Sequence, residues 1–117
     1  MTHIVTKASL QALMDRNDQV TMHAVGRALV VLFKRQTEHE KQANTTEVHN
    51  NVGFTSGDAW GGCVAAKTYI KNGMLADWQV RKWTKRSPTT GFSRLCKYWR
   101  QLDEAAKEKA AERREAA

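Results

Sequence analysis

Apolar side chains recur every three or four residues along most of the chain, which is the spacing of one helix face. Residues 21–43 show it most clearly. The apolar positions of this segment are Met22, Val25, Leu29, Leu32 and Phe33. A glycine at position 26, inside the helix, costs about 1 kcal/mol relative to alanine. We therefore expect another helix to pack closely there.

Two further helices are predicted, one before and one after the helix of residues 21–43. Thr6 can cap a helix over residues 7–15, whose apolar face is Leu10, Leu13 and Met14. Residues 44–56 are polar and predict a loop. The sequence Thr55-Ser56-Gly57-Asp58 then resembles a capping box, with the Asp58 side chain reaching back to Thr55. A helix of small residues follows to about residue 71, where Asn72-Gly73 is a typical stop.

The last third of the chain predicts two more helices. One covers about 76–85 and ends before Ser87-Pro88, because the residue before proline disfavours helix. The other begins near Thr89 or Thr90, and its inward face is Phe92, Leu95, Trp99 and Leu102. At about 100° per residue, Trp83 and Trp99 fall at the centres of the apolar arcs and are expected in the core.

These elements predict an all-α protein, a compact bundle of four to five helices with no strand. The 117-residue chain is short enough for one domain. We assign residues 1–103 to a single helical domain. Residues 104–117 contain mostly Ala, Glu, Lys and Arg, and are expected to form a charged helical tail that continues the last helix and frays at its end.

Several functional classes find no support in the sequence. No run approaches the roughly 20 apolar residues of a membrane span, and the N-terminus does not resemble a signal peptide. We therefore expect a cytoplasmic protein whose cysteines, Cys63 and Cys96, are reduced. Cysteine and histidine spacing fits no metal site, and no glycine-rich phosphate loop is present. No enzyme activity, metal or cofactor is expected.

The positive charge is concentrated in one segment. The net charge is +7, yet residues 1–70 and 101–117 are nearly balanced. Residues 71–100 contain eight basic residues against one acidic residue, Asp77, and also five of the nine aromatic residues. General solubility does not require such clustering, whereas a polyanionic partner does. A merely solvated basic face remains the alternative.

Helical geometry selects the candidate contact residues. Trp78 and Tyr98 fall at the edges of the two apolar arcs, where they could stack on unpaired bases or pack half-buried. The cations on the polar faces could neutralise phosphates. The predicted nucleic-acid-binding residues are Trp78, Arg81, Lys82, Lys85, Arg86, Arg94, Lys97 and Tyr98. Backbone N–H groups at a helix start near Ser87–Thr90 would add a further phosphate contact. A helix-turn-helix is a weaker alternative.

Short motifs through the middle of the chain resemble a known module. They are Arg35-Gln36-Thr37-x-x-Glu40, Asn50-x-Val52-Gly53-Phe54, Asp58-Ala59, Asn72-Gly73-x-Leu75, Gln79, and Lys97-Tyr98-x-x-Gln101-Leu102. The resemblance covers roughly residues 27–103. The module occurs in small uncharacterised phage and plasmid proteins and in segments attached to phage DNA-processing enzymes. It implies a mobile genetic element and a setting of DNA or RNA metabolism, and it supplies no catalytic residue.

Charge and resemblance together predict a non-enzymatic nucleic-acid-binding accessory protein of a phage or plasmid. Its partner would be DNA, RNA or a nucleoprotein complex. The alternative is a protein-binding inhibitor of a host defence complex, comparable to an anti-CRISPR protein.

Overall fold

The computed structural model describes residues 5–43, 53–55 and 57–116, except the side chains of 38–43 and 113–116. Within these ranges the chain forms five α-helices and one 3-10 helix. They are α1 (Lys7–Arg16), α2 (Gln19–Ala43), α3 (Ala59–Asn72), α4 (Asp77–Thr84), η1 (Arg94–Tyr98) and α5 (Trp99–Ala116). The predicted all-α class and helix number are confirmed.

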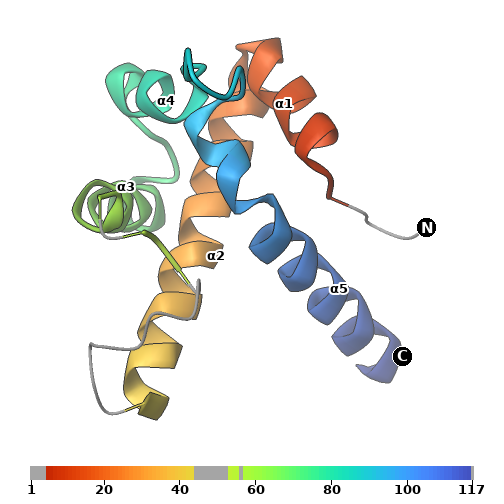
Figure 1. Ribbon diagram of the computed structural model, residues 1–117. Helices are drawn as coiled ribbons and strands as arrows, with labels where there is room; N and C mark the ends of the chain where they lie inside the picture. Colours follow the sequence, from red (N-terminus) through yellow and green to blue (C-terminus); the bar gives the residue numbers. More distant parts are fainter. Residues whose placement is uncertain (1–4, 44–52, 56, 117) are drawn as a thin grey trace.

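The long helix α2 is the centre of the arrangement (Figure 1). It packs against α1, α3, α4 and α5. Helices α3 and α4 lie on one side of α2, whereas α5 leaves the other helices as it runs to the C-terminus (Figure 1). No helix among the described residues is long and apolar enough to cross a membrane.

The core forms where the predicted apolar faces meet. Val25, Leu29 and Leu32 of α2 are fully buried, as the spacing predicted. Trp83 of α4 is also fully buried, so its predicted place in the core is confirmed. On α1, Leu10 and Met14 are buried, while Leu13 packs at the edge of the core. The core therefore joins all the elements around α2.

Gly26 marks the closest contact between α2 and α3. A Cβ atom at this position would collide with the Tyr69 ring of α3. The Tyr69 hydroxyl lies 2.9 Å from His23 Nδ1, one turn earlier on α2. The expected close packing at Gly26 is confirmed, because the missing side chain makes room for an aromatic ring.

The last helix begins later than predicted. Residues 87–91 form a turn instead: Gly91 N–H donates to the Ser87 carbonyl, Ser87 N–H donates to the Phe92 carbonyl, and Gly91 has φ of +75°. Ser93 fixes the end of this turn, because its N–H donates to Gln11 Oε1 at 2.7 Å and its hydroxyl donates to the Thr84 carbonyl at 2.5 Å. No helix starts at Ser87–Thr90, so the phosphate contact predicted there is wrong.

The 3-10 geometry of η1 changes which side chains face inward. In a 3-10 helix, residues three apart share a face. Leu95 and Tyr98 are therefore both buried, with 0 % and 3 % of their surfaces exposed. Trp99 only packs against the core from outside. The predictions that Tyr98 lies at an edge and Trp99 in the core are both wrong, because they assumed 3.6 residues per turn.

Helix α5 crosses the predicted boundary between domain and tail without a break. Its first turns are attached to α2 by Arg35, which donates to the Gln101 carbonyl at 2.8 Å and to Glu104 Oε2 at 2.9 Å. The predicted loop over 44–56 lies outside the described residues except for 53–55.

Candidate nucleic-acid interface

The eight predicted contact residues divide between two elements. Trp78, Arg81 and Lys82 lie on α4, and Lys85 follows at its C-terminal end. Arg94, Lys97 and Tyr98 belong to η1. Arg86 lies between them, where it forms an isolated β-bridge with Ser93. Among the described residues, only the α4 group has all its cations free of carboxylate partners; Trp78, Arg81 and Lys85 are exposed and Lys82 is half-buried.

The η1 group is organised around Asp58, at the start of α3. The Asp58 side chain is only 3 % exposed. Its Oδ1 lies 2.8 Å from Arg94 Nη1, and its Oδ2 lies 2.6 Å from Lys97 Nζ. The Tyr98 hydroxyl also donates to Oδ2 at 2.6 Å. A buried carboxylate is costly unless it is paired and hydrogen-bonded, and these three groups meet that requirement.

This network shifts the ionisation of its members. Burial opposes ionisation of Asp58, but the hydrogen bonds from Lys97 and Tyr98 outweigh it and hold the pKa of the carboxyl below its usual value. Burial and donation to Asp58 raise the pKa of Tyr98 to about 12. Asp58 is therefore an anion and Tyr98 a neutral donor at neutral pH.

Two predictions are corrected by these contacts. Tyr98 cannot stack on a base, because its ring is buried between Phe54 and Trp83. Asp58 does not reach back to Thr55 as a capping box requires, since Thr55 N–H donates to the Tyr98 hydroxyl and Asp58 is itself the N-cap residue of α3. The carboxylate instead accepts from side chains of η1, which lie about 40 positions later in the sequence.

Three of the predicted cations are paired with carboxylates from the first seventy residues. Arg94 and Lys97 share Asp58, and Arg86 lies 2.7 Å from Asp15 Oδ2. The Arg86 pair is about half-exposed, so it contributes little to stability. It still places an anion beside that guanidinium, which lessens its attraction for phosphate.

The α4 cations keep their charge uncompensated. Within the part of the chain that the structure describes, Arg81, Lys82 and Lys85 form no ion pair with a carboxylate. Trp78 stands one helical turn before Lys82 and is 59 % exposed. These four residues therefore form a cationic and aromatic face.

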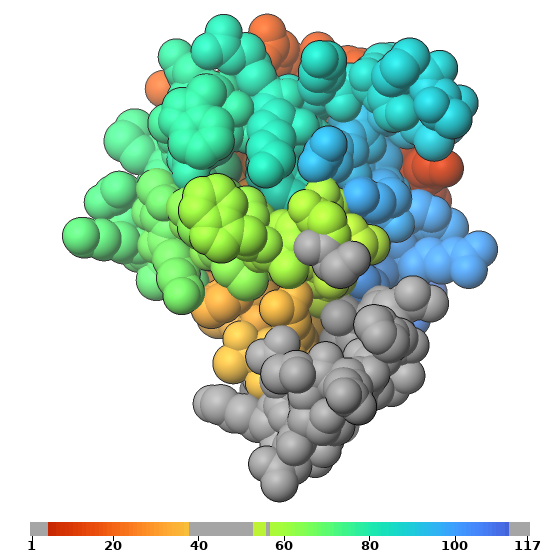
Figure 2. All heavy atoms as spheres, turned by 60° about the vertical axis from the view of Figure 1, so that its left-hand side comes forward, coloured from red at the N-terminus to blue at the C-terminus, as the bar shows by residue number. Residues whose placement is uncertain are grey.

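Sequence reasoning missed Trp60, which extends this face onto α3. Trp60 is 80 % exposed. Lys82 connects the two helices, because a Cβ at Gly61 would meet the Lys82 ammonium. Figure 2 shows the first turn of α3 next to α4 on one face of the molecule. We call Trp60, Trp78, Arg81, Lys82 and Lys85 the recognition face.

A signal for Trp60 was present in the sequence. The buried residues of α3 are Gly62, Ala65 and Ala66. At 100° per residue, position 60 falls on the opposite side of the helix from their mean direction. An aromatic side chain there faces away from the core, so its exposure could have been predicted.

A shallow depression of about 320 Å³ continues from the recognition face toward η1. Its lining includes Lys82, Lys85, Arg86 and Arg94. The described residues contain no cluster of three His, Cys, Asp or Glu side chains that could hold a metal ion. The charged residues that line the depression are all cationic.

No family model, curated protein or solved structure matches the chain.

Proposed function

We propose that this protein is a non-enzymatic accessory protein that binds single-stranded nucleic acid through its recognition face. It would act in the cytoplasm, in the setting of a phage or plasmid. The observation that carries the proposal is the pair of exposed tryptophans, Trp60 of α3 and Trp78 of α4, with Lys82 of α4 lying against Gly61, the residue after Trp60.

Each part of the face has a role in this proposal. Unpaired bases stack on exposed aromatic rings, and every base has a π-face, so stacking tolerates any sequence. Lysine and arginine neutralise phosphates and release counterions. Two exposed tryptophans with cations beside them thus offer contacts to both the bases and the phosphates of a single strand. A duplex keeps its bases stacked inside and would gain only the phosphate contacts.

Fluorescence anisotropy with labelled 20-nucleotide DNA and RNA, single- and double-stranded, tests this proposal. Each of Trp60→Ala and Trp78→Ala should weaken single-strand binding about tenfold, because stacking contributes about 1–3 kcal/mol per base. Duplex binding should change less than twofold. Ile70→Ala is the matched control, since Ile70 is 56 % exposed on α3 but lies outside the recognition face. Equal losses on single strands and duplexes would rule out stacking.

A protein-binding inhibitor remains the second candidate. Exposed Val20, Met74 and Trp78 favour it, and Met74, Arg81 and Val80 line one depression of about 390 Å³. Methionine, tryptophan and arginine are enriched in protein interfaces. Such an inhibitor would keep a stoichiometric protein partner after nuclease treatment, and Met74→Ala would weaken that complex without affecting oligonucleotide binding.

A further inference from the structure

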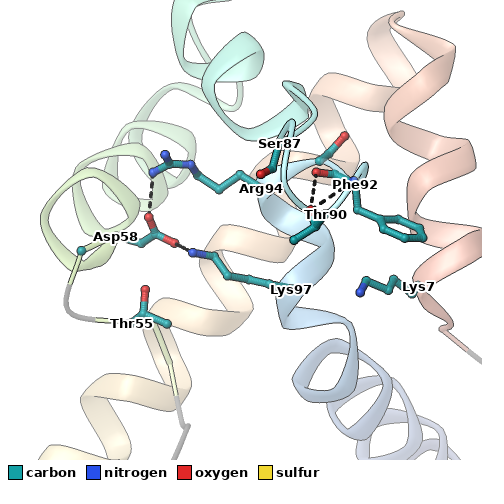
Figure 3. Close-up of a pocket in the computed structure, with 10 residues that line it drawn as sticks. Lys7, Thr55, Asp58, Ser87, Thr90, Phe92, Arg94 and Lys97 are labelled. Carbon is teal, nitrogen blue, oxygen red and sulfur yellow. Dashed lines mark hydrogen bonds and ion pairs between the residues drawn. The ribbon is translucent and has the colours of Figure 1, made fainter.

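A separate cavity of about 480 Å³ opens among the start of α1, the 87–93 turn, η1 and the start of α3. Figure 3 shows Lys7 and Phe92 on one side of it, and Asp58 with Arg94 and Lys97 on the other. The recognition face contributes no side chain to its lining. The cavity therefore requires its own explanation.

The cavity has more positive than negative charge. Arg94 and Lys97 both pair with Asp58, but one carboxylate neutralises only one of them. Lys7 adds a third cation and has no ion pair in the ranges described above. Its ammonium lies 4.5 Å from the centre of the Phe92 ring. Two positive charges remain, which suits a dianion.

The same side chains offer unused hydrogen-bond donors. The Lys97 ammonium has three N–H donors, and one of them faces Asp58 Oδ2. Arg94 uses Nη1 for Asp58, which leaves the other guanidinium N–H groups to point elsewhere. The Ser87 hydroxyl accepts from Thr89 N–H, so its own proton can be donated. Several donors around one anion are the usual mode of phosphate binding.

We propose that this cavity binds a phosphate monoester. Its volume is far larger than a phosphate group needs and lies within the usual range of small-molecule pockets, about 300–1,000 Å³. The organic part of the ligand would lie beside Phe92, and the phosphate would lie between Lys7, Arg94 and Lys97. The ester can be a free nucleotide-sized molecule or the terminal phosphate of a strand.

The second of these ligand sources, the terminal phosphate of a strand, rests on the proposed function. The depression lined by Lys82 and Lys85 shares Ser87 and Arg94 with the cavity. A strand on the recognition face could therefore follow a continuous cationic path into the cavity. Its end would bring a phosphate monoester to Lys7.

Calorimetric titration with thymidine 5′-monophosphate, inorganic phosphate and thymidine tests the cavity itself. Both phosphates should bind, and thymidine should not. Lys7→Gln should weaken binding of the monophosphate about tenfold, because it removes a charge-assisted contact. This change leaves the Asp58 ion pairs in place, so folding is preserved. Lys71→Gln, a matched charge change at an exposed site, should have less than a twofold effect. Equal binding of thymidine and its monophosphate, or a Lys7→Gln protein that binds like wild type, would overturn the proposal.

Ten-nucleotide oligothymidylates with a 5′-phosphate, a 3′-phosphate or neither distinguish a strand end from a free small molecule as the ligand. If a strand end occupies the cavity, one terminal phosphate should tighten binding about tenfold in the wild type and not in Lys7→Gln. If no terminal phosphate matters while the monophosphate still binds, the ligand is a free small molecule. Trp60→Ala should weaken all three strands equally and leave monophosphate binding unchanged. These measurements therefore test the proposal for the recognition face and the proposal for the cavity independently.

Discussion

At the scale of single residues, Asp58 decides which predicted cations remain available. Its buried carboxylate holds Arg94, Lys97 and Tyr98 within hydrogen-bond distance. The sequence could not reveal this, because the partners are about 40 positions apart and Asp58 also fits a local capping role. The exposure of Trp78 and Arg81 depends only on the periodicity of their own helix, so it was predictable from the sequence.

The Tyr98 hydroxyl should stabilise the fold and not contact ligand. In Tyr98→Phe the buried Asp58 loses one donor, so the free energy of unfolding should fall by about 2 kcal/mol. Urea denaturation measures this change, and oligonucleotide affinity of the folded variant should match that of wild type. A Tyr98→Phe variant with the same free energy of unfolding as wild type would show that the hydrogen bond to Asp58 does not stabilise the fold.

Acid should remove the stabilisation that Asp58 provides. The pKa of its carboxyl is depressed below the ordinary 3.8 in the folded protein. Such a group stabilises the fold above its unfolded pKa, and the effect disappears as pH falls through the folded pKa. Wild type should therefore exceed Asp58→Asn in free energy of unfolding by a constant amount above about pH 5. The difference should narrow below pH 3.8.

Asp18 and Asp103 also have lowered pKa values. They are present in both proteins, so their contributions cancel in this comparison. A wild-type advantage over Asp58→Asn that persists unchanged to pH 2 would show that the charge of Asp58 is not what stabilises the fold.

At the scale of elements, regular helices were predictable and the irregular segment 86–98 was not. The periodicity located α1, α2 and α4 because each places its apolar side chains on one face, whereas α3 was located from its small residues and the Asn72-Gly73 stop. The segment 86–98 combines a turn, a β-bridge and a 3-10 helix, and it is fixed by Ser93 hydrogen bonds to Gln11 and Thr84. These contacts are tertiary, so local patterns could not predict them.

Two helical glycines should respond in opposite ways to alanine. At Gly26 a Cβ collides with the Tyr69 ring, and overpacking of this kind costs about 1–3 kcal/mol. At Gly61 the Cβ meets only the flexible end of Lys82, so the better helix propensity of alanine should stabilise the protein by up to about 1 kcal/mol. Thermal unfolding of both variants gives the comparison. If Gly26→Ala is as stable as Gly61→Ala, α2 and α3 do not pack as described.

At the scale of the whole molecule, side chains of α2, η1 and α5 form a connected hydrogen-bonded region with the described residues of the segment 53–58. Gln36 Oε1 accepts from Phe54 N–H, Gln101 bonds with both backbone groups of Gly53, and Tyr98 donates to Asp58. Segments far apart in sequence are thereby tied together. This hydrogen-bonded region thus supports the fold, and the recognition face lies outside it.

The number of cations on the recognition face sets how strongly the affinity for single strands should depend on salt concentration. With Arg81, Lys82 and Lys85 as phosphate contacts, log affinity for single strands should fall against log salt with a slope of about −2. Arg81→Gln should reduce the magnitude of this slope by about 0.7, because one contact is lost. Arg100→Gln, on α5 and over the Trp99 ring, should leave it unchanged. A slope unaffected by Arg81→Gln would place the phosphates elsewhere.

Intrinsic tryptophan fluorescence during titration with oligothymidylate tests the central claim most directly. Trp60 and Trp78 are exposed, while Trp83 is fully buried, so stacking should quench the first two. The wild type should show saturable quenching, and the double variant Trp60→Phe and Trp78→Phe should bind the strand with almost no quenching. Quenching that persists in the double variant, or binding by the wild type without quenching, would contradict the account.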